Sequence, residues 1–576
     1  MTKFKETIKN IRKYLFNDDR KLKFRIFFGA FVSFAFVLNF FLYGPIDIYL
    51  GNSMHFVYSL SELLLPVLLT GAGAFAVLLS LCFLLKGRSY NWYITLMSSL
   101  SFASYLQVMF MNKSVVLLDG TQVEWEHQAT SAILGLLVWV GVILLFYGLL
   151  CYCKKVWKYA VSFVSVLICF VQIVSIVSGA FMVTIDEKSS IVATSDGELE
   201  ISSKHNVVVL SVDSFDIRCT EEVMENSPEY FDEFDGFTWY KNTISHNSRT
   251  FPNIAVILTG KECLYDKEYE EYMEDAWKDN RFLEDIKAAG YDSRLYIKSV
   301  YVNSDEEYMM DYTSNYKKAD RNVYSVELEK KMIGLSMYRS LPVALKPFFE
   351  TDTSELNGAM AVDKFTLATE RDERYYKKLR EQGLSISDST GEKGTFTYFH
   401  FNGCHAPFVF DENCMPAKGK VTSKEAARGA LTNISEYLRQ LKEQGVYDNS
   451  TIIITTDHAY AGKETELERE RVVTLFYKPA NARGEIVIDN SPQQLWNIRP
   501  TVLKAMGLEY ASYGTPFDEV AQDADIKRYF YMSAANEDGS VREHKLLTYE
   551  VVGDANDFNN WKLIDKRPIE FPYLKG

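Results

Sequence analysis

The sequence lacks the excess of basic residues on which nucleic-acid binding depends. Its 576 residues include 62 Lys and Arg against 76 Asp and Glu, a formal net charge of −14. Neutralising the phosphates of a nucleic acid requires clustered Lys and Arg, so nucleic acid is disfavoured as the main partner. We also expect no cleavable signal peptide. Its basic start leads into a full-length apolar run, with no small-residue cleavage site behind a short apolar core.

Charged residues are absent from five long apolar runs in the first third of the chain. A membrane-spanning helix needs about 20 predominantly apolar residues, and five successive runs with charged residues between them are far more typical of spans than of buried globular helices. Spans without charged residues favour an anchor over a transporter or channel. The runs are Ile26–Tyr43, Leu63–Leu85, Trp92–Met111, Ala129–Cys151 and Tyr159–Val183.

The connections between these runs alternate in charge. Nine Lys and Arg precede the first run, and further basic residues lie in the second and fourth connections. The first and third connections are acidic, with Lys113 as their only basic residue. Basic connections stay on the cytoplasmic side. We therefore expect a multi-pass protein of the cell membrane, with a cytoplasmic N-terminus and everything after Val183 outside the cytoplasm.

The charge balance divides the chain in two. Residues 1–185 carry a net charge of +7, which leaves −21 for the remainder. Such a contrast, in a chain too long for one core, indicates a membrane part and a separate soluble part. The expected divisions are a cytoplasmic segment 1–25, a five-span domain 26–183, a linker 184–205, a catalytic domain 206–527 and a C-terminal subdomain 528–576. The last is expected to be a small antiparallel β addition.

The soluble part alternates strand-like and helical segments. Short β-branched or aromatic runs predict strands at Asn206–Val212, Ser293–Ile297, Thr395–Phe401, Thr451–Thr455 and Val472–Tyr477. Helical patterns lie between them, notably at Asp279–Ala289 and Lys424–Gln444. This alternation predicts an α/β domain with a largely parallel sheet. Active sites of such sheets gather at the carboxyl ends of the strands.

Three of these strand ends carry residues suited to a metal. Asp213 follows the first strand, Asp457 and His458 follow Thr451–Thr455, and His405 follows Thr395–Phe401. Carboxylates and imidazole suit a divalent cation such as Zn²⁺ or Mn²⁺, although a single Asp or His in such a place is more often a cap or a surface group. Thr250 precedes a short apolar helical stretch, where it is either a simple N-cap or an anion-facing nucleophile.

These motifs resemble a known family. From Asn206 to about Tyr510 the chain resembles the sulfatase-like branch of the alkaline phosphatase superfamily. The matching segments are NVVVLSVDSFD, Thr250-Phe251-Pro252 with Leu258-Thr259-Gly260, GCHAPF and YDNSTIIITTDH. With five preceding spans, the layout is similar to that of lipoteichoic acid synthases and related membrane phosphoglycerol or phosphoethanolamine transferases. The resemblance implies an alkaline phosphatase-like α/β/α sandwich.

The resemblance also implies roles for individual residues. Asp213, Thr250, Asp457 and His458 would hold one divalent metal ion, and Thr250 would also be the nucleophile. His405 would bind substrate or transfer a proton. We expect Arg249 and His400 to be substrate-binding neighbours. True sulfatases carry Cys or Ser at the nucleophile position and Arg four residues later; here those positions are Thr250 and Ile254, which disfavours sulfate ester hydrolysis by that route.

The expected reaction is transfer of a phospho-head group from a membrane phospholipid to an envelope glycan or lipid, through a phospho-threonine intermediate. A membrane-anchored phosphodiesterase or sulfatase-like hydrolase is the alternative, and a non-catalytic sensor is a further one.

The outer domain contains an even number of cysteines, and disulfides can persist outside the cytoplasm. The pairings Cys404–Cys414 and Cys219–Cys263 are plausible from their closeness in the sequence.

Overall fold

The computed structural model forms two compact units. The first, here called the membrane unit, contains residues Met1–Lys188 and Arg321–Ala361, and the second, the α/β unit, contains Ser189–Asp320 and Val362–Gly576. The structure describes residues 21–53, 56, 58–112, 125–182, 191–298, 301–303, 306–318, 326–349, 356, 371–387, 390–417, 419–459, 472–534 and 544–573.

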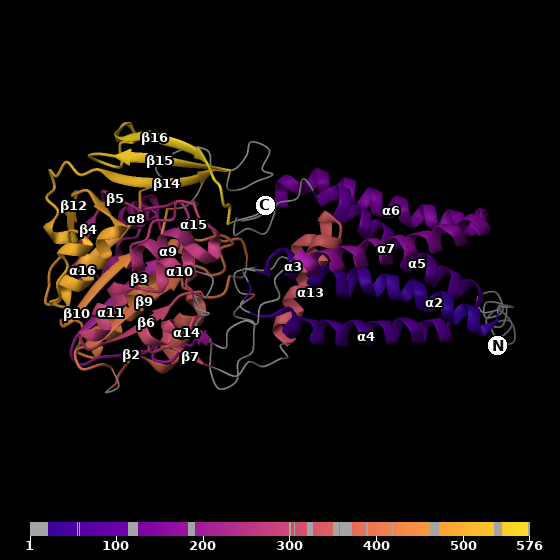
Figure 1. The fold of residues 1–576 in the computed structure, drawn as a ribbon, viewed down its shortest axis with the longest axis horizontal. Coiled ribbons are helices and arrows are strands. Elements are labelled where there is room, and N and C mark those ends of the chain that lie inside the picture. The colour runs from indigo at the N-terminus through magenta and orange to yellow at the C-terminus, as the bar shows by residue number, and fades with distance from the viewer. Residues whose placement is uncertain are drawn as a thin grey trace. The chain divides into compact units, whose positions relative to one another are not determined.

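Five helices among the described residues are long and apolar enough to cross a membrane (Figure 1). The first begins as α2 (Leu22–Val37), passes through a π-helical turn η1 (Leu38–Leu42) and continues as α3 (Tyr43–Gly51). The others are α4 (Leu60–Leu84), α5 (Gly87–Leu106) with its π-helical end η3 (Gln107–Met111), α6 (Ala129–Tyr152) and α7 (Lys154–Met182). The five predicted spans are confirmed as apolar helices, and the protein is an integral, multi-pass membrane protein.

A segment from far along the chain also belongs to the membrane unit. Helix α13 (Val326–Ser340) and the 3₁₀ helix η8 (Val343–Phe349) fall inside the 206–527 range that the sequence assigns to the catalytic domain. Leu328 and Met332 of α13 pack in one core with apolar residues of α3 and α4. A Cβ on Gly44 would lie 1.8 Å from Oγ of Ser336, so the close approach of α3 to α13 requires glycine there.

The α/β unit is built on a seven-stranded sheet with the order β12-β4-β11-β10-β3-β9-β6. Strands β10, β3, β9 and β6 are parallel neighbours, while β11 is antiparallel to both β10 and β4. The sheet is therefore largely parallel, as the sequence predicts. The bounds are β12 (Val487–Asp489), β4 (Thr238–Tyr240), β11 (Leu475–Lys478), β10 (Ser450–Thr455), β3 (Asn206–Val212), β9 (Gly394–Phe401) and β6 (Tyr291–Tyr296).

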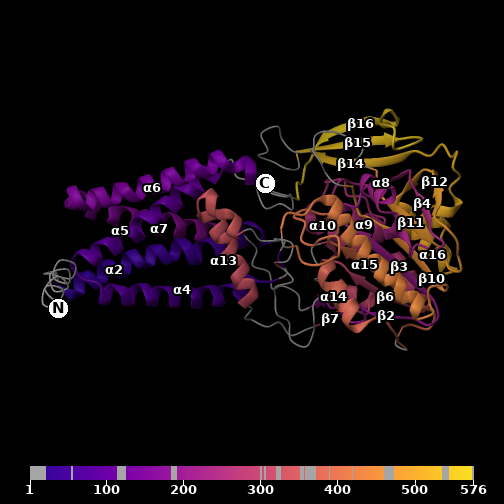
Figure 2. The ribbon, with the colours of Figure 1, turned by 180° about the vertical axis from the view of Figure 1, so that it is seen from behind.

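Helices cover both faces of this sheet (Figures 1 and 2). Side chains of β3 alternate between two cores: Val208 packs with one set of helices and Val209 with the other, as the two-residue repeat of a strand requires. The first set is α8 (Ile217–Asn226), α14 (Asp372–Gln382) and α15 (Ser423–Glu443). The second is α9 (Thr250–Thr259), α10 (Tyr269–Trp277), α11 (Arg281–Ala288) and α16 (Ile498–Ala505). The predicted α/β/α sandwich is confirmed.

Helix α15 illustrates how local sequence fixes an element. The hydroxyl of Thr422 accepts from the backbone N–H of Glu425, whose carboxylate accepts from the N–H of Thr422. This reciprocal capping box satisfies two of the free N–H groups at the helix start. Gly445 follows the helix with a φ of +71°, the left-handed conformation that ends helices.

The C-terminal part forms a separate antiparallel sheet of β14 (Arg528–Ala534), β15 (Lys545–Val551) and β16 (Trp561–Pro568), and the predicted β addition is confirmed. Among the described residues, six further short strands form three pairs, and two of these strands, β1 (Ile191–Ala193) and β2 (Glu200–Ile201), lie within the predicted linker. β1 pairs with β7 (Tyr316–Lys318), and β2 pairs with β8 (Ser385–Ile386). β5 (Thr243–Ile244) pairs with β13 (Gln493–Gln494). The remaining short elements are α12 (Tyr308–Tyr312), η5 (Trp125–Gln128), η6 (Pro228–Phe231), η12 (Leu495–Asn497), η13 (Ala511–Tyr513), η14 (Phe517–Glu519) and η15 (Phe558–Asn560).

The eight cysteines are free thiols, so the expected disulfide pairings are not formed. Cys219 and Cys263 belong to cores on opposite faces of the sheet, which separates the two thiols. Cys404 instead lies beside Cys219. A hydrogen bond with Cys219, together with burial, raises the pKa of the Cys404 thiol well above its usual value.

Candidate metal and nucleophile site

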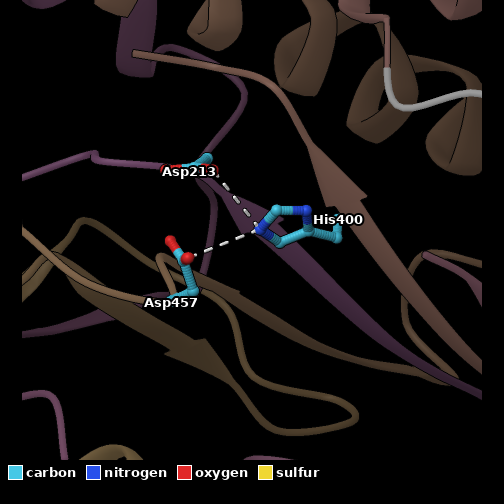
Figure 3. Close-up of side chains that lie close together, drawn as sticks. All are labelled: Asp213, His400 and Asp457. Carbon is cyan, nitrogen blue, oxygen red and sulfur yellow. Dashed lines mark ion pairs between the residues drawn. The ribbon is translucent and has the colours of Figure 1, made fainter. Parts of the chain in front are cut away.

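The carboxyl ends of three adjacent strands bring two carboxylates and an imidazole together. Asp213 follows β3, Asp457 lies two residues beyond β10, and His400 is the penultimate residue of β9. Strand β3 lies between the other two in the sheet, so residues 57 to 244 positions apart in the chain become neighbours. Figure 3 shows the imidazole of His400 pointing toward both carboxylates.

The geometry of this cluster fits a divalent cation. Nε2 of His400 lies 3.9 Å from Oδ2 of Asp213 and 3.6 Å from Oδ2 of Asp457. The three candidate ligand atoms lie within 4.8 Å of one another, and all three side chains are buried. Two carboxylates buried this close repel each other strongly unless a positive charge balances them. A bound cation supplies that charge, so the cluster could hold a metal ion.

The carboxyl group of Asp457 is held in its charged form. Burial acts to raise its pKa, but His458, His400 and Thr250 more than offset it, and the pKa lies below the ordinary range of an aspartate. The imidazole nitrogens closest to its Oδ2 are 3.5 and 3.6 Å away, longer than a good hydrogen bond. The lone pairs of Oδ2 are therefore available to a cation.

Thr250 and His458 complete the site. Thr250 is the first residue of α9, and its Oγ1 lies 3.3 Å from Oδ2 of Asp213 and 3.2 Å from Nε2 of His458. The same nitrogen of His458 lies 3.6 Å from Oδ1 of Asp213 and 3.5 Å from Oδ2 of Asp457. The structure thus brings together all four residues predicted as metal ligands and adds His400, which the sequence predicts as a substrate contact. Their individual roles stay predictions.

The tautomer of His458 follows from its other ring nitrogen. Nδ1 lies 2.7 Å from the backbone carbonyl of Ala459. A carbonyl can only accept, so Nδ1 carries the hydrogen and, in the neutral ring, Nε2 presents its lone pair to the site. This is the arrangement usual for a metal-binding histidine.

Two hydroxyl side chains hold the strand ends in place. Oγ1 of Thr456 accepts from the backbone N–H of Phe215 at 3.2 Å and donates to the carbonyl of His458 at 2.7 Å, which links the end of β3 to the end of β10. Ser214 donates to Oδ1 of Asp213 at 2.8 Å from a backbone with a φ of +59°. A left-handed serine is strained, and such strain is typical of functional sites.

Asn253, which the sequence analysis missed, shapes the chain before the nucleophile. Its Oδ1 accepts from the backbone N–H groups of His246 and Asn247, at 3.1 and 2.8 Å. Its Nδ2 donates to the carbonyls of Asn247 and Arg249, at 2.7 and 2.8 Å. One fully buried amide therefore satisfies four backbone groups of the loop that presents Thr250. The sequence signal that could have identified Asn253 is a polar residue three positions after the Thr that starts the helix.

Arg249 and His246 connect this loop to other parts of the α/β unit. Nε of Arg249 donates to Oγ of Ser533 on β14 at 2.9 Å. His246 lies 3.1 Å from Glu262 through Nε2 and 3.0 Å from Gln494 through Nδ1. The backbones of residues 246 and 248 also hydrogen-bond with Tyr531. The C-terminal sheet is thus part of the support for the nucleophile loop.

His405 lies in the loop after β9 and is half-buried. Its backbone N–H donates to the carbonyl of Asn402 at 3.0 Å, and the adjacent N–H of Cys404 donates to the carbonyl of Asp213 at 2.9 Å. Among the described contacts, none joins the His405 imidazole to the cluster. Its backbone is therefore fixed beside the site, while its proposed substrate role stays a prediction.

A second missed residue, Asp372, holds the same loop. Its Oδ2 accepts from the N–H of Gly403 at 3.0 Å. Burial raises the pKa of Asp372 to about 7, helped by the nearby Glu373. Gly403 has a φ of +51°, and a Cβ there would lie 2.3 Å from Val212, so the loop packs directly on the end of β3.

Comparison with known proteins identifies the family of the chain. The sulfatase family model matches residues 205–508, more than half of the chain. None of the curated proteins matches. Similar solved structures include an alkaline phosphatase superfamily protein from Vibrio parahaemolyticus, at 14% identity over 64% of this chain and 83% of that one, with a TM-score of 0.40. Lipoteichoic acid synthase LtaP from Listeria monocytogenes is 13% identical over 65% of this chain and 87% of its own, with a TM-score of 0.33.

The matched range begins just before β3, ends just after α16, and contains every residue of the cluster. The chain therefore belongs to the sulfatase family.

Proposed function

We propose that this protein transfers a phospho-head group, phosphoglycerol or phosphoethanolamine, from a membrane phospholipid to an envelope glycan or lipid. The transfer passes through a covalent phospho-threonine intermediate at Thr250. The observation that supports it is the place of Thr250, whose hydroxyl starts a helix and lies within 3.3 Å of Asp213 and His458. Helix N-termini attract anions such as phosphate.

In the first half-reaction, Oγ1 of Thr250 attacks phosphorus. The Thr–O–P bond forms as the P–O bond to diacylglycerol breaks, and the hydroxyl proton leaves toward one of the two acceptors within 3.3 Å of Oγ1, Asp213 and His458. The released alkoxide takes up a proton, which we assign to His405 on its loop beside Asp213. In the second half-reaction, an acceptor hydroxyl attacks phosphorus and passes its proton to His405. The Thr–O–P bond breaks, and the threonine oxygen takes back the proton held by Asp213 or His458.

A divalent cation, Zn²⁺ or Mn²⁺, would be held by Asp213, Asp457 and His458 with Thr250, and by His400 in the arrangement described above. When bound, it would lower the pKa of the threonine hydroxyl and balance charge on the transferred group. Arg249 is proposed to contact the phosphate. Its tie to Ser533 through Nε holds the guanidinium on the loop that presents Thr250.

The membrane unit supports a membrane lipid as the donor substrate. A lipid donor need not leave the bilayer if the enzyme is anchored there, whereas a hydrolase of soluble esters has less need of five spans. The alternation of basic and acidic connections supports a cytoplasmic N-terminus and an α/β unit outside the cytoplasm. On that side the donor is a lipid of the outer leaflet.

Thr250→Ala tests the proposal most directly. Mass spectrometry of lipids and envelope glycans should show diacylglycerol and the modified acceptor with the wild-type protein and neither with the variant. Thr250→Ser, which keeps a hydroxyl, should retain part of the activity. Thr259→Ala is the matched control, because Thr259 ends the same helix and its hydroxyl only bonds the carbonyl of Ala255 and the N–H of Lys261.

The products distinguish transfer from hydrolysis. Free head-group phosphate without a modified acceptor would replace the transferase proposal with a membrane-anchored phosphodiesterase. Sulfate release from sulfated glycans would replace it with a sulfatase-like hydrolase. Full activity of Thr250→Ala would contradict a covalent intermediate at Thr250.

A further inference from the structure

The short helix η8 of the membrane unit distributes its side chains in the opposite way to a segment in water. Its sequence is VALKPFF, with Lys346 as its single charged residue. Lys346 is fully buried, whereas Phe348 is 79% and Leu345 is 40% exposed. Residues three positions apart lie on the same side of a 3₁₀ helix, so Leu345 and Phe348 form one exposed apolar edge. In water-soluble proteins, lysine is almost never fully buried and phenylalanine is among the residues most often buried.

The charge of Lys346 is satisfied inside the membrane unit. Its Nζ donates to the backbone carbonyl of Tyr338 and lies 4.9 Å from the centroid of the Tyr338 ring. Both contacts stabilise an ammonium group. The Tyr338 ring also contacts that of Trp125, with 6.2 Å between the centroids, and such rings are enriched at membrane–water boundaries. The outward side of η8 therefore carries apolar side chains and no charge.

Two prolines reduce the number of backbone donors that η8 must satisfy. Pro342 directly precedes the helix and Pro347 lies inside it, and neither has a backbone N–H. The N–H of Leu345 donates to the carbonyl of Pro342 at 2.8 Å. Unsatisfied backbone groups are what exclude irregular segments from hydrocarbon, so this composition suits a segment in contact with lipid.

Helix η8 lies against a part of α6 that faces lipid. A Cβ on Gly135 would lie 3.7 Å from the backbone nitrogen of Val343, an ordinary contact distance. Gly135 is the seventh residue of α6, about 9 Å along the helix at 1.5 Å per residue. Because α6 crosses the membrane, its exposed apolar side chains contact lipid. Those on either side of Gly135 are more than half exposed: Ile133, Leu134 and Leu137.

We propose that η8 is immersed in the leaflet in which α6 begins, with Leu345 and Phe348 in contact with lipid acyl chains. Their apolar edge continues the lipid-facing surface of α6. Helix α13 runs across the bundle rather than along it (Figures 1 and 2). It has 15 residues, whereas a span needs about 20. Helices α13 and η8 together thus dip into one leaflet without crossing the bilayer.

The partner of this apolar edge is the hydrocarbon of the bilayer, whichever lipid supplies it. The contact selects no head group, and it depends neither on Thr250 nor on the transfer reaction. On the topology predicted from the charged connections, the leaflet is the outer one. A stretch that the sequence assigns to the catalytic domain is therefore a membrane-contacting surface in its own right.

Nitroxide labels attached at Phe348→Cys and, separately, at Leu345→Cys test this inference in the full chain. The background carries Cys151→Ser and Cys153→Ser, which replace the two exposed cysteines. The labelled protein is reconstituted in phosphatidylcholine nanodiscs. Collisions of the nitroxide with oxygen, which concentrates in hydrocarbon, are compared with collisions with a nickel chelate, which stays in water. At both positions we expect frequent oxygen collisions and loss of nickel collisions.

Two reference positions define hydrocarbon and water. Leu137→Cys lies on the lipid-facing side of α6, and the labels on η8 should match it. Val487→Cys replaces an apolar residue that is 60% exposed on β12 of the α/β unit, and it should collide with the nickel chelate. Nickel collisions on η8 equal to those at Val487→Cys would overturn the inference. So would shielding from both reagents, which would mean that protein covers the edge; spin–spin broadening that dilution with unlabelled protein removes would identify a second copy.

Thermal unfolding in the same nanodiscs gives a second readout. A charged side chain is unfavourable in hydrocarbon, whereas substitutions at a water-exposed position are usually close to neutral. Phe348→Asp should therefore lower the unfolding temperature. Phe348→Leu, which keeps an apolar side chain, should leave it nearly unchanged. A Phe348→Asp protein as stable as wild type would contradict the immersion of η8.

Discussion

Oγ1 of Thr250 and Nε2 of His458 lie 3.2 Å apart although 208 residues separate them in the chain. The carbonyl of Ala459 holds Nδ1 of the same ring at 2.7 Å, so the lone pair of Nε2 is directed at the hydroxyl. A hydroxyl, an oriented imidazole and the nearby carboxylates form one connected group. Each of the following predictions changes one contact of that group or of its supports.

Metal binding should depend on Asp457. We expect about one divalent ion per chain in the purified protein. Asp457→Asn should lower metal content and activity at least about a hundredfold. Loss of a residue that only hydrogen-bonds to a metal ligand costs about 10–100-fold in metal affinity or activity, and loss of a direct ligand should cost no less. Metal analysis and turnover measure the two effects. Asp448→Asn is the matched control, because Asp448 is exposed in the turn before β10. Normal metal content in Asp457→Asn would contradict the assignment.

His400 has two proposed roles that a single variant separates. If it binds the metal with Asp213 and Asp457, His400→Gln lowers metal content. If it binds substrate, as the sequence alone predicts, the variant raises KM and leaves metal content unchanged. The distances of 3.6 and 3.9 Å to the carboxylates lead us to expect the first result.

Asn253→Ala should reduce kcat without reducing metal content. The variant leaves two N–H groups and two carbonyls of the nucleophile loop without their partner, and a small displacement of a nucleophile can cost about a hundredfold in rate. Steady-state kinetics and metal analysis on the same preparation check this. Loss of metal together with activity would show instead that the site as a whole had collapsed.

Asp372 should make stability fall as the pH rises. Its folded pKa of about 7 lies above the ordinary 3.8 because the carboxyl group is buried. Below about pH 4 it is protonated in both states. Between about pH 4 and 7 the unfolded chain loses the proton first, so this contribution is lost progressively as pH rises, by at most about 4 kcal/mol.

Asp372→Asn removes this dependence because the amide has no proton to lose and its oxygen can still accept from Gly403. The variant should match wild type in thermal unfolding at about pH 3 and unfold at a higher temperature at pH 8. Asp411→Asn controls for a general loss of charge: Asp411 is half-buried, and an amide oxygen there can still accept from the N–H groups of Asn413 and Met415. A variant less stable than wild type at pH 8 would mean that the carboxylate is needed there.

Ser533→Ala should weaken the support of Arg249 from the C-terminal sheet. Without the hydrogen bond from Nε of Arg249 to Ser533, we expect a severalfold rise in KM with little change in the melting temperature, since one partly exposed hydrogen bond contributes about 1 kcal/mol. Arg249→Lys should raise KM further. An unchanged KM in both variants would place Arg249 outside the substrate site.

The sequence predicted the parts of the site that strand ends determine. Asp213, Asp457 and His458 directly follow continuous apolar strands, so the parallel sheet alone brings them together. The role of His400 was harder to predict. A histidine inside the run TFTYFHF does not show which side chains at the ends of β3 and β10 lie beside it. Asn253 and Asp372 act on the backbones of loops, whose paths exist only in the folded chain. Helix α13 has no long apolar run, and its place in the membrane unit depends on the absence of a side chain at Gly44.

The return of α13 to the membrane unit constrains the order in which the protein can be made. The ribosome completes the five spans and strands β3 and β6 before α13, and only later supplies β9, which lies between β3 and β6 in the sheet. The sheet therefore cannot close until α13 has been synthesised. A secreted version cut free of its spans would carry Leu328, Met332 and Leu335 with nothing to cover them, and we expect it to aggregate unless residues 321–361 are replaced by a short polar loop.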